Sequence, residues 1–428
     1  MKPLSECNTE ELKQIKDRAL KKHEEFIKAG ISINMARGKP SAEQLDFSDD
    51  ILNLTKAEMG VCSEDGTDCR NYGGLCGIPE CRRLFGEMLG VSPENVIACG
   101  SSSLNLMYDY ISQCMTLGTA GCEPWLLQKD CKFIAVVPGY DRHFAIAQHF
   151  GLEMINVPMT VSGPDMDMIE NIVKDPKVKG MFCVPKYSNP DGITYSAETV
   201  ERLAKMKPAA KDFRVIWDEA YIVHDLYDEH DELENIFDAA AKYGNEDNFI
   251  AFASTSKISF AGAGVAAMAA SSANIKEICS RLTIQIISYD KLNQLRHAYF
   301  YKDLNDVRRQ MKKHASLLRP RFDTVLDGLK KELDGLKIAS WNNPRGGYFI
   351  SLDVNTGSAK YVGKLCKDCG LTLTNVGATY PYGKDPDDKN IRIAPSLPSV
   401  EELRTATSIL CNAVIIAACE ELEKQYTA

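Results

Sequence analysis

Three short polar motifs carry residues of this chain that could do covalent chemistry. In chain order they are Ser188-Asn189-Pro190-Asp191-Gly192, Trp217-Asp218-Glu219-Ala220-Tyr221 and Ser254-Thr255-Ser256-Lys257. Lys257 carries an amine that can bind an aldehyde, and Asp218 carries a carboxylate that can pair with a protonated ring nitrogen. Asn189 and Tyr221 can donate hydrogen bonds to a ring oxygen. Pyridoxal phosphate requires this set of groups from a protein.

The neighbours of Lys257 favour a reactive amine over an ordinary exposed one. A lysine that forms a Schiff base must lose its proton, and desolvation promotes that loss. Small and apolar residues follow Lys257 in the run Ala261-Gly262-Ala263-Gly264-Val265-Ala266. We therefore expect Lys257 to be partly desolvated.

Two further groups are ambiguous when each is taken alone. Asp218 ends a predicted strand, where a carboxylate needs a cationic partner or several hydrogen bonds, but a strand-end aspartate can also simply cap a turn. The run Gly100-Ser101-Ser102-Ser103 opens a predicted helix, where backbone N–H groups and hydroxyls could hold a phosphate. An ordinary helix cap with spare serines is the alternative.

The elements that must position these residues follow from the apolar pattern. Short runs that are apolar on both faces alternate with helical segments, which indicates a parallel sheet covered on both sides. Such sheets bind ligands where the carboxyl ends of strands meet helix N-termini. The runs lie at residues 96–98, 133–137, 180–184, 215–217 and 249–253.

A second, smaller α+β domain is expected around the ends of the chain. The prediction assigns residues 48–310 to a large domain that binds pyridoxal phosphate, and residues 1–47 with 311–428 to the small domain. The elements predicted outside the sheet are helices over residues 9–29 and 291–332, strands at 347–352 and 390–394, and a last helix opened by the capping box that begins at Ser399.

With these motifs in this order, the chain resembles the fold-type I pyridoxal phosphate aminotransferases of class I/II. The run from Ser254 through Lys257 to Gly264 is similar to an outlying bacterial subgroup of aspartate aminotransferases. The resemblance covers essentially the whole chain. It implies an α/β fold of the pyridoxal phosphate transferase type, with a mainly parallel seven-stranded sheet between helices in the large domain.

The resemblance also implies roles for the cofactor-binding residues. Lys257 would form the Schiff base and move the proton between Cα and the cofactor, and Asp218 would pair with the pyridine nitrogen. Asn189, before a cis peptide bond to Pro190, and Tyr221 would bond the ring oxygen. The remaining expected cofactor contacts are a stacking ring from Tyr140 and phosphate contacts from Ser101, Ser102 and Ser254.

Other implied residues concern the partner subunit and the substrate. Tyr72 resembles the tyrosine that reaches the phosphate of a neighbouring subunit, so the resemblance implies a homodimer with shared active sites. Arg392 matches the arginine that binds the substrate α-carboxylate, and the segment Arg37-Gly38-Lys39 matches the loop that lines the substrate site. The chain departs from the pattern where many relatives place a phosphate-binding arginine, because Gly264 and Val265 stand there.

The expected substrates are amino acids and 2-oxo acids, and the leading hypothesis is transfer from an acidic L-amino acid, namely aspartate, to 2-oxoglutarate. Arg37, Lys39 and Arg296 are candidate cations for a side-chain carboxylate. An aminotransferase or β-lyase acting on aromatic amino acids or alanine is an alternative. A sensor domain that binds pyridoxal phosphate is a weaker one, because only about forty residues precede the large domain, too few for a winged helix.

Composition and charge bear on partners and location. The formal net charge is -9 and no basic stripe exists, which argues against nucleic acid. No signal peptide and no run of about eighteen uncharged apolar residues is evident, so we expect a cytoplasmic protein without a membrane segment. The 15 cysteines complete no zinc pattern, and we expect reduced thiols and no metal.

Overall fold

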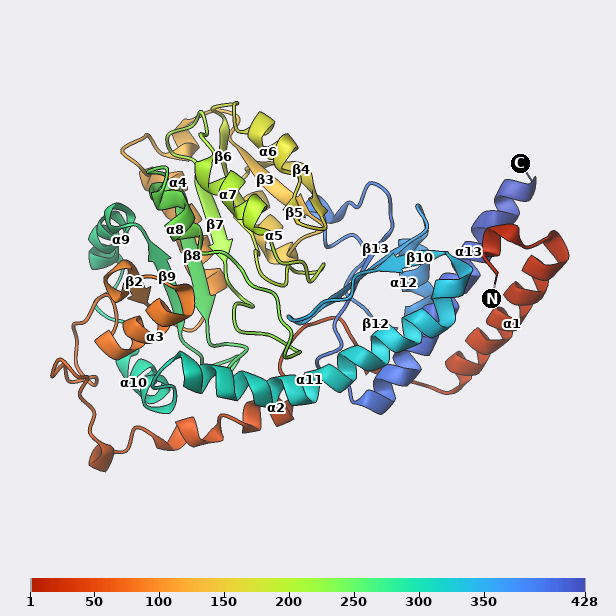
Figure 1. Cartoon of the computed structure of the whole chain (residues 1–428), viewed down its shortest axis with the longest axis horizontal. Coiled ribbons are helices and arrows are strands. Elements are labelled where there is room, and N and C mark those ends of the chain that lie inside the picture. Colours follow the sequence, from red (N-terminus) through yellow and green to blue (C-terminus); the bar gives the residue numbers. More distant parts are fainter. Residues whose placement is uncertain (1, 428) are drawn as a thin grey trace.

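A twisted sheet between two layers of helices forms one body of the molecule, and a long helix joins it to a second body (Figure 1). The computed structural model describes residues 2–427. The sheet has the order β2-β9-β8-β7-β6-β3-β4-β5. Its strands are β2 (Val96–Ala98), β3 (Lys132–Val137), β4 (Glu153–Thr160), β5 (Gly163–Pro164), β6 (Val178–Cys183), β7 (Arg214–Asp218), β8 (Phe249–Ser254) and β9 (Ala266–Ala270).

The sheet is mainly parallel, as predicted. The pairs β4–β3, β3–β6, β6–β7 and β7–β8 are parallel, and every residue of β6 and β7 is buried. Strand β9 runs antiparallel to both β8 and β2. The sheet has eight strands where seven were expected, because the short β5 pairs two residues with the end of β4.

Helices cover both faces of the sheet. One buried cluster packs the strands against α3, α6, α7 and α8, and another packs them against α4, α5 and α9. These helices, with α10, are α3 (Pro79–Leu89), α4 (Ser103–Leu117), α5 (Asp141–His149), α6 (Met166–Ile172), α7 (Ala197–Lys205), α8 (Ile236–Ala241), α9 (Ser272–Gln285) and α10 (Lys291–Phe300).

The second body has its own buried cluster, which includes both ends of the described chain. Its antiparallel sheet has the order β10-β11-β13, and β1 pairs with β12. The elements are α1 (Thr9–Lys28), β1 (Ile33–Asn34), α2 (Ala42–Asp46), α11 (Leu304–Leu333), β10 (Ala339–Trp341), β11 (Ile350–Val354), α12 (Ala359–Asp368), β12 (Leu371–Thr372), β13 (Asn390–Ile393) and α13 (Val400–Thr427).

Helix α11 runs from one body into the other (Figure 1). Val307 and Met311 belong to the cluster under the large sheet, whereas Leu318 and Leu333 belong to the cluster of the second body. The predicted boundary at residue 310 therefore falls inside a helix, and the exact division into domains stays a prediction.

Some predicted elements agree with the structure and others do not. Gly30, with a positive φ of 62°, follows α1, and the Ser399 side chain and Glu402 form the predicted cap of α13. The predicted helix over residues 291–332 is split, because the chain turns after Phe300 and Asp303 caps α11 through the backbone N–H of Asp306. Strands β4 and β9 were not predicted: β4 is half exposed, and β9 consists of alanines and one methionine.

Helix α13 is the element of the described chain that comes nearest in composition to a membrane segment. Within residues 2–427 the segment Val400–Tyr426 is the one helix long and apolar enough to cross a membrane by length and composition, with a mean hydropathy of 1.4. However, 67% of that apolar window is buried inside the structure, where α13 packs on α1, α11 and α12. Burial in the second body accounts for the apolar character of this helix.

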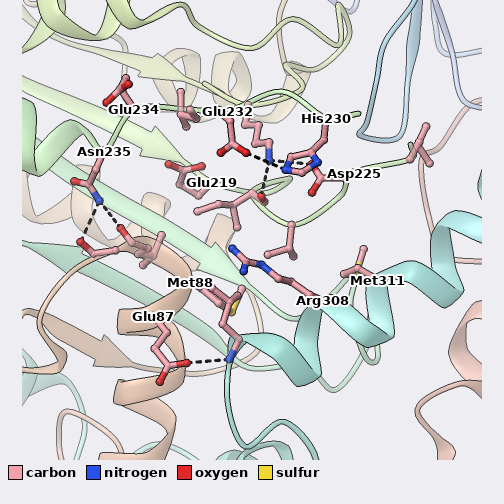
Figure 2. A pocket seen from close by; sticks show the side chains of 18 of the residues that line it. Glu87, Met88, Glu219, Asp225, His230, Glu232, Glu234, Asn235, Arg308 and Met311 are labelled. Atoms are coloured by element: carbon pink, nitrogen blue, oxygen red, sulfur yellow. Dashed lines mark hydrogen bonds and ion pairs between the residues drawn. The ribbon is translucent and has the colours of Figure 1, made fainter. Parts of the chain in front are cut away.

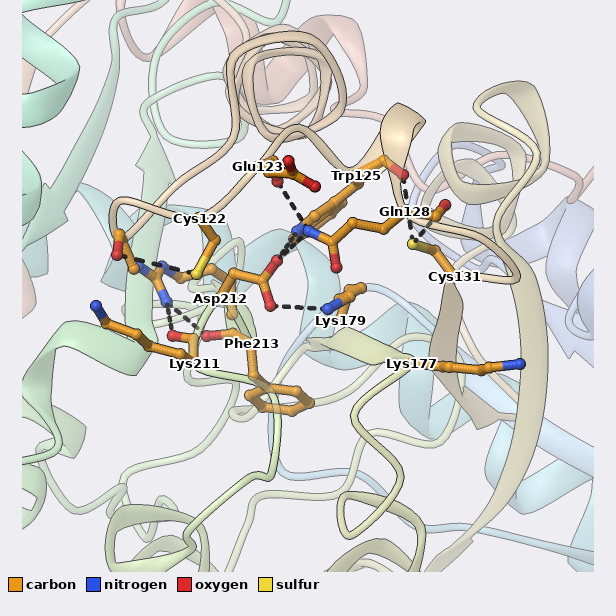
Figure 3. Close-up of polar contacts among 12 residues, drawn as sticks. Cys122, Glu123, Trp125, Gln128, Cys131, Lys177, Lys179, Lys211, Asp212 and Phe213 are labelled. Carbon is orange, nitrogen blue, oxygen red and sulfur yellow. Dashed lines mark hydrogen bonds and ion pairs between the residues drawn. The ribbon is translucent and has the colours of Figure 1, made fainter.

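A buried ion pair lies at the N-terminal end of β7, a central strand of the large sheet (Figure 3). Asp212 accepts hydrogen bonds from Lys179 Nζ at 2.9 Å, Trp125 Nε1 at 3.0 Å and Gln128 Nε2 at 2.9 Å. Both oxygens of this buried carboxylate are thus satisfied by the protein, which is the usual condition for burying a charge.

Candidate active site

The residues predicted to do chemistry lie at the other ends of these strands, the C-terminal ends of the parallel strands. Asp218 is the last residue of β7, and Ser254 is the last residue of β8, three positions before Lys257. Tyr140 follows β3 and precedes α5, and Ser102 is the N-cap of α4. Strand ends and helix starts therefore converge here, as expected for a parallel sheet.

Asp218 is held by a residue that the sequence analysis did not single out. The carboxylate is 3% exposed, and its Oδ2 atom lies 3.1 Å from Nε2 of His143 on α5. The other carboxylate oxygen, Oδ1, is buried and has no hydrogen-bond partner among the described residues. A buried oxygen without a hydrogen bond costs folding free energy, so this position favours binding of a group that can donate to Oδ1.

The missing donor fits the pyridinium N–H of pyridoxal phosphate. Asp212 lies just before β7, and both of its carboxylate oxygens accept hydrogen bonds. Asp218 lies at the end of β7, and only one of its oxygens does so. A protonated ring nitrogen would supply both the second hydrogen bond and the compensating positive charge. The residues present therefore fit this cofactor.

Lys257 lies beside Tyr221, close to Asp218. Its Nζ atom is 4.9 Å from the centre of the Tyr221 ring. Desolvation by burial lowers the pKa of Lys257 below the usual value, and the charge of Asp218 opposes this shift in part. Burial, with the Tyr140 phenol and Asp218 adding to it, raises the pKa of Tyr221, so this phenol keeps its proton and can act as a donor.

Aromatic rings pack around the His143–Asp218 pair. His143 stacks on Phe182 with ring centres 4.5 Å apart, and its edge meets the Tyr140 ring at 4.9 Å. Burial, followed by the charges of Asp218 and Asp141, raises the pKa of Tyr140 to about 12. The ring predicted to stack on the cofactor is thus neutral and lies beside the carboxylate predicted to bind the ring nitrogen.

Serines from two chain segments form a cluster at the start of α4. Ser256 Oγ donates to the backbone oxygen of Ser101 at 3.1 Å, and Ser254 Oγ donates to Ser256 Oγ at 2.7 Å. Ser102 caps α4 by accepting from the backbone N–H of Asn105. Hydroxyls and the positive end of a 15-residue helix here could hold a phosphate.

The missing phosphate-binding arginine has a steric explanation. A Cβ atom on Gly264 would lie 2.9 Å from Thr255 Oγ1 and 3.0 Å from the Ser256 backbone nitrogen. Val265 is buried, and its backbone N–H donates to Thr255 Oγ1. The chain packs too tightly at these positions to project a long side chain toward the serines.

Arg392 is 7% exposed and lies at the meeting point of the two bodies. Its Nη1 atom donates to Asp141 Oδ1 at 2.9 Å and to Asn189 Oδ1 at 3.1 Å, and its Nε donates to Thr374 Oγ1 at 3.3 Å. The guanidinium also stacks on the Phe349 ring at 4.9 Å. The Asn189–Pro190 bond is cis, as predicted.

The predicted substrate loop lies next to Phe349. A Cβ on Gly38 would come within 2.6 Å of Phe349 Cζ, so the loop approaches the ring under Arg392 more closely than any other residue type allows. Arg37 and Lys39 are both exposed. The structure therefore brings Gly38 to the Arg392 site and leaves the two cations on the surface.

Two other predicted residues lie away from Asp218. Tyr72 has an exposed fraction of 75% and belongs to a turn whose backbone oxygens, on Asn71 and Gly73, accept from Lys291 Nζ. Arg296 donates to Asn293 at 2.7 Å, and Asn293 in turn donates to the backbone oxygen of Gly264. Arg296 thus has a structural partner near the serine cluster.

Four residues that lie in this site were given no role from the sequence, namely His143, Asp141, Ser256 and Phe349. A sequence signal existed for His143, because it stands three residues after Tyr140, so that the two lie on the same face where α5 begins. Asp141 and Phe349 carried no such signal, since their importance depends on contact with Arg392.

A separate cavity of about 930 Å³ lies beside β7, lined by Trp217, Glu219 and the first turns of α11 (Figure 2). Burial raises the pKa of Glu219 to about 7, and Trp217 Nε1 donates to this carboxyl at 2.8 Å. Lys186 pairs with Asp225 at 2.9 Å in the same cavity. None of the residues predicted for the active site lines this cavity.

Comparisons with known proteins agree with the family that the sequence resembles. The family model described as aspartate amino-transferase matches residues 7–426. An aspartate aminotransferase of Corynebacterium glutamicum is 46% identical over 401 residues, covering 94% of this chain and 93% of its own length. A putative aminotransferase of Mycolicibacterium smegmatis is 47% identical over 395 residues, covering 92% of both chains.

Solved structures show the same fold. The crystal structure of an aspartate transaminase from Corynebacterium glutamicum has a TM-score of 0.96 at 45% identity and covers 98% of this chain and 99% of its own. The α-aminoadipate aminotransferase of Thermus thermophilus, complexed with N-(5′-phosphopyridoxyl)-L-leucine, has a TM-score of 0.73 at 19% identity and covers 91% of this chain and 93% of its own. The chain therefore belongs to the aspartate aminotransferase family of pyridoxal phosphate-dependent enzymes.

Proposed function

We propose that this enzyme transfers the amino group of an acidic L-amino acid, aspartate first, to 2-oxoglutarate. The observation that carries the proposal is Arg392, a buried guanidinium positioned on Phe349 and hydrogen-bonded to Asn189. The name of the relative at 46% identity supports aspartate as the donor.

In this proposal Arg392 binds the substrate α-carboxylate. A planar guanidinium can hold a carboxylate by two parallel hydrogen bonds, which orients the Cα–H bond for proton removal. The stacking contact with Phe349 and the bond to Asn189 limit the positions the guanidinium can take. The approach of Gly38 to the same ring closes this side of the site.

Lys257 is the proposed base. Its pKa is lowered by desolvation, so a larger fraction of the amine is neutral near neutral pH than for an exposed lysine. The Nζ atom then accepts the proton from Cα of the substrate. When bound, pyridoxal phosphate supplies the electron sink that makes this proton acidic.

Asp218, Tyr221 and the serines are proposed to hold and tune the cofactor. Asp218 would keep the ring nitrogen protonated, with His143 fixing the carboxylate from the other side. The phenol of Tyr221 and the amide of Asn189 would donate to the ring oxygen, with Tyr140 stacked on the ring. Ser101, Ser102 and Ser254 would contact the phosphate, joined by Ser256.

We further propose a homodimer in which each subunit completes the other's site. Tyr72 is a large aromatic residue with a 75% exposed fraction, yet its turn is held by two hydrogen bonds from the buried Lys291. A rigid turn that presents an exposed ring suits a contact with a second copy, where Tyr72 would donate to the phosphate.

A panel of single half-reactions tests the substrate assignment. Cofactor-loaded enzyme is mixed with one amino donor at a time, chosen from aspartate, glutamate, alanine and phenylalanine, and the change in cofactor absorbance gives each rate. The aminated enzyme is then mixed with 2-oxoglutarate, oxaloacetate or pyruvate to follow recovery. We expect aspartate and 2-oxoglutarate to give the highest values of kcat/KM. A faster reaction with alanine or phenylalanine than with either acidic donor would overturn the assignment.

A further inference from the structure

Arg392, the arginine proposed to bind the substrate, is already paired with a carboxylate of the protein, that of Asp141. Asp141 is the first residue of α5, and its Oδ1 atom accepts from Arg392 Nη1 at 2.9 Å. Arg392 is 7% exposed at its side chain and Asp141 is 30% exposed. The two residues therefore form a charge pair whose acidic member is still open to solvent or to an incoming ligand.

The hydrogen bonds of Arg392 leave only part of the guanidinium free. Nη1 carries two hydrogens, and these point to Asp141 and Asn189, while Nε donates to Thr374. Within residues 2–427 Nη2 has no hydrogen-bond partner. A guanidinium binds a carboxylate bidentately through Nη2 with either Nη1 or Nε, so an incoming carboxylate finds Nη2 free and its second donor already in use.

Asp141 opposes substrate binding in either geometry. If the ligand uses Nη1, the bond to Asp141 must break. If the ligand uses Nε and Nη2, Asp141 remains as a negative charge on the same guanidinium and repels the ligand's carboxylate. We propose that Asp141 sets the affinity of the enzyme for its substrates, because it competes with the substrate α-carboxylate for Arg392. This inference rests on the proposed function of Arg392.

The neighbouring residue provides a place for the displaced carboxylate. Arg142 Nε lies 4.0 Å from Asp141 Oδ2, and the Arg142 side chain is 55% exposed. Asp141 also lies in the first turn of α5, where the helix dipole stabilises a negative charge. The Asp141 carboxylate can therefore leave Arg392 with Arg142 and the helix end as alternative partners.

Binding of succinate, an unreactive dicarboxylate, to the cofactor-loaded enzyme tests the competition by isothermal titration calorimetry. Asp141→Asn keeps the shape of the side chain and removes its charge, and we expect the dissociation constant to fall about tenfold. Asp141→Glu retains the charge and should stay within about twofold of the unaltered enzyme. With aspartate as substrate, Asp141→Asn should lower KM and leave kcat unchanged.

The controls separate this proposal from simpler effects. Asp167→Asn removes an exposed carboxylate that pairs with Arg202, remote from the site, and should leave succinate binding unaltered. Asp141→Ser is the second variant if the asparagine form does not fold, since serine suits the start of a helix. An unchanged or increased dissociation constant in both the Asn and Ser variants would mean that Asp141 only positions Arg392, and the inference would be wrong.

A separate variant tests whether Arg392 binds the substrate carboxylate at all. If Arg392 is the carboxylate site, Arg392→Lys weakens succinate binding, because an ammonium cannot form the planar pair. Unaltered binding in Arg392→Lys would refute the role of Arg392 itself, whatever the Asp141 variants show.

Discussion

The Nε2 atom of His143 lies 3.1 Å from one oxygen of Asp218, and the other oxygen has no partner among the described residues. The pair is 75 residues apart in the chain and is almost fully buried. His143 therefore fixes one carboxylate oxygen of Asp218, and the other oxygen can accept a hydrogen bond that the cofactor can donate.

A double-mutant cycle tests how these two residues act together. Asp218→Asn should slow the half-reaction with aspartate about 10²- to 10³-fold, because the ring nitrogen loses the charge that keeps it protonated. His143→Asn should slow it about tenfold, and should have little further effect in the Asp218→Asn background, since its role depends on the carboxylate. Stopped-flow absorbance gives the rates. Additive effects in the double variant would show that His143 acts independently of Asp218.

Lys257 gives a prediction about pH. Because burial lowers its pKa, the amine becomes neutral at a lower pH than a free lysine. The rate at which cofactor-free enzyme captures pyridoxal phosphate should therefore rise with pH and level off below 10.5, the ordinary lysine value. Lysine acetylated at its Nα atom serves as the control with a free side-chain amine. Borohydride reduction should attach the cofactor to Lys257 in the mass spectrum, and Lys257→Ala should show no such adduct.

Gly38 provides a test of the substrate side of the site. Gly38→Ala places a Cβ 2.6 Å from Phe349 Cζ, so the ring that supports Arg392 must move. We expect kcat/KM for aspartate to fall about ten- to a hundredfold, because a small displacement of a positioning group is costly. Gly262→Ala is the matched control, since no atom lies within 4 Å of a Cβ there. Equal kinetics for both variants would remove Gly38 from the substrate site.

The shared active site can be tested by mixing inactive variants. A heterodimer of Lys257→Ala and Tyr72→Ala subunits contains one site in which both residues are intact. Random exchange in an equal mixture should therefore restore about a quarter of normal activity, since half of the dimers are mixed and each has one working site of two. Sedimentation velocity measures the dimer directly. No recovery after proven subunit exchange would place Tyr72 in its own subunit's site or outside it.

The thiols Cys76 and Cys279, 3.1 Å apart, lead to a prediction about alkylation. A hydrogen bond from Cys279 lowers the pKa of Cys76 below its usual value, so a larger fraction of Cys76 is thiolate at neutral pH than for an unperturbed cysteine. Iodoacetamide at pH 7 should modify Cys76 ahead of Cys81, which is fully buried and whose pKa is raised. Cys279→Ala should slow the reaction by removing the donor. Peptide mass spectrometry gives both rates, and an unaltered rate in Cys279→Ala would contradict the proposed hydrogen bond.

Much of the architecture could be predicted from local patterns. The buried strands β2, β3, β6, β7 and β8 have runs of apolar residues that are characteristic of parallel sheets. Strand β9 consists mostly of alanines, which have no strong strand preference. It forms by pairing with β2 on one side and β8 on the other, and these partners are in place only once the sheet is assembled.

The sequence by itself determined the positions of Asp218 and Lys257, because a residue just after a buried strand must lie at the carboxyl edge of a parallel sheet. Only the tertiary structure decided what these residues and Arg392 touch. Asp141 and Arg392 are 251 residues apart, and they meet because α11 and the sheet β10-β11-β13 set the second body against the start of α5. Contacts of this kind depend on the packing of whole elements, and no local pattern of residue types encodes them.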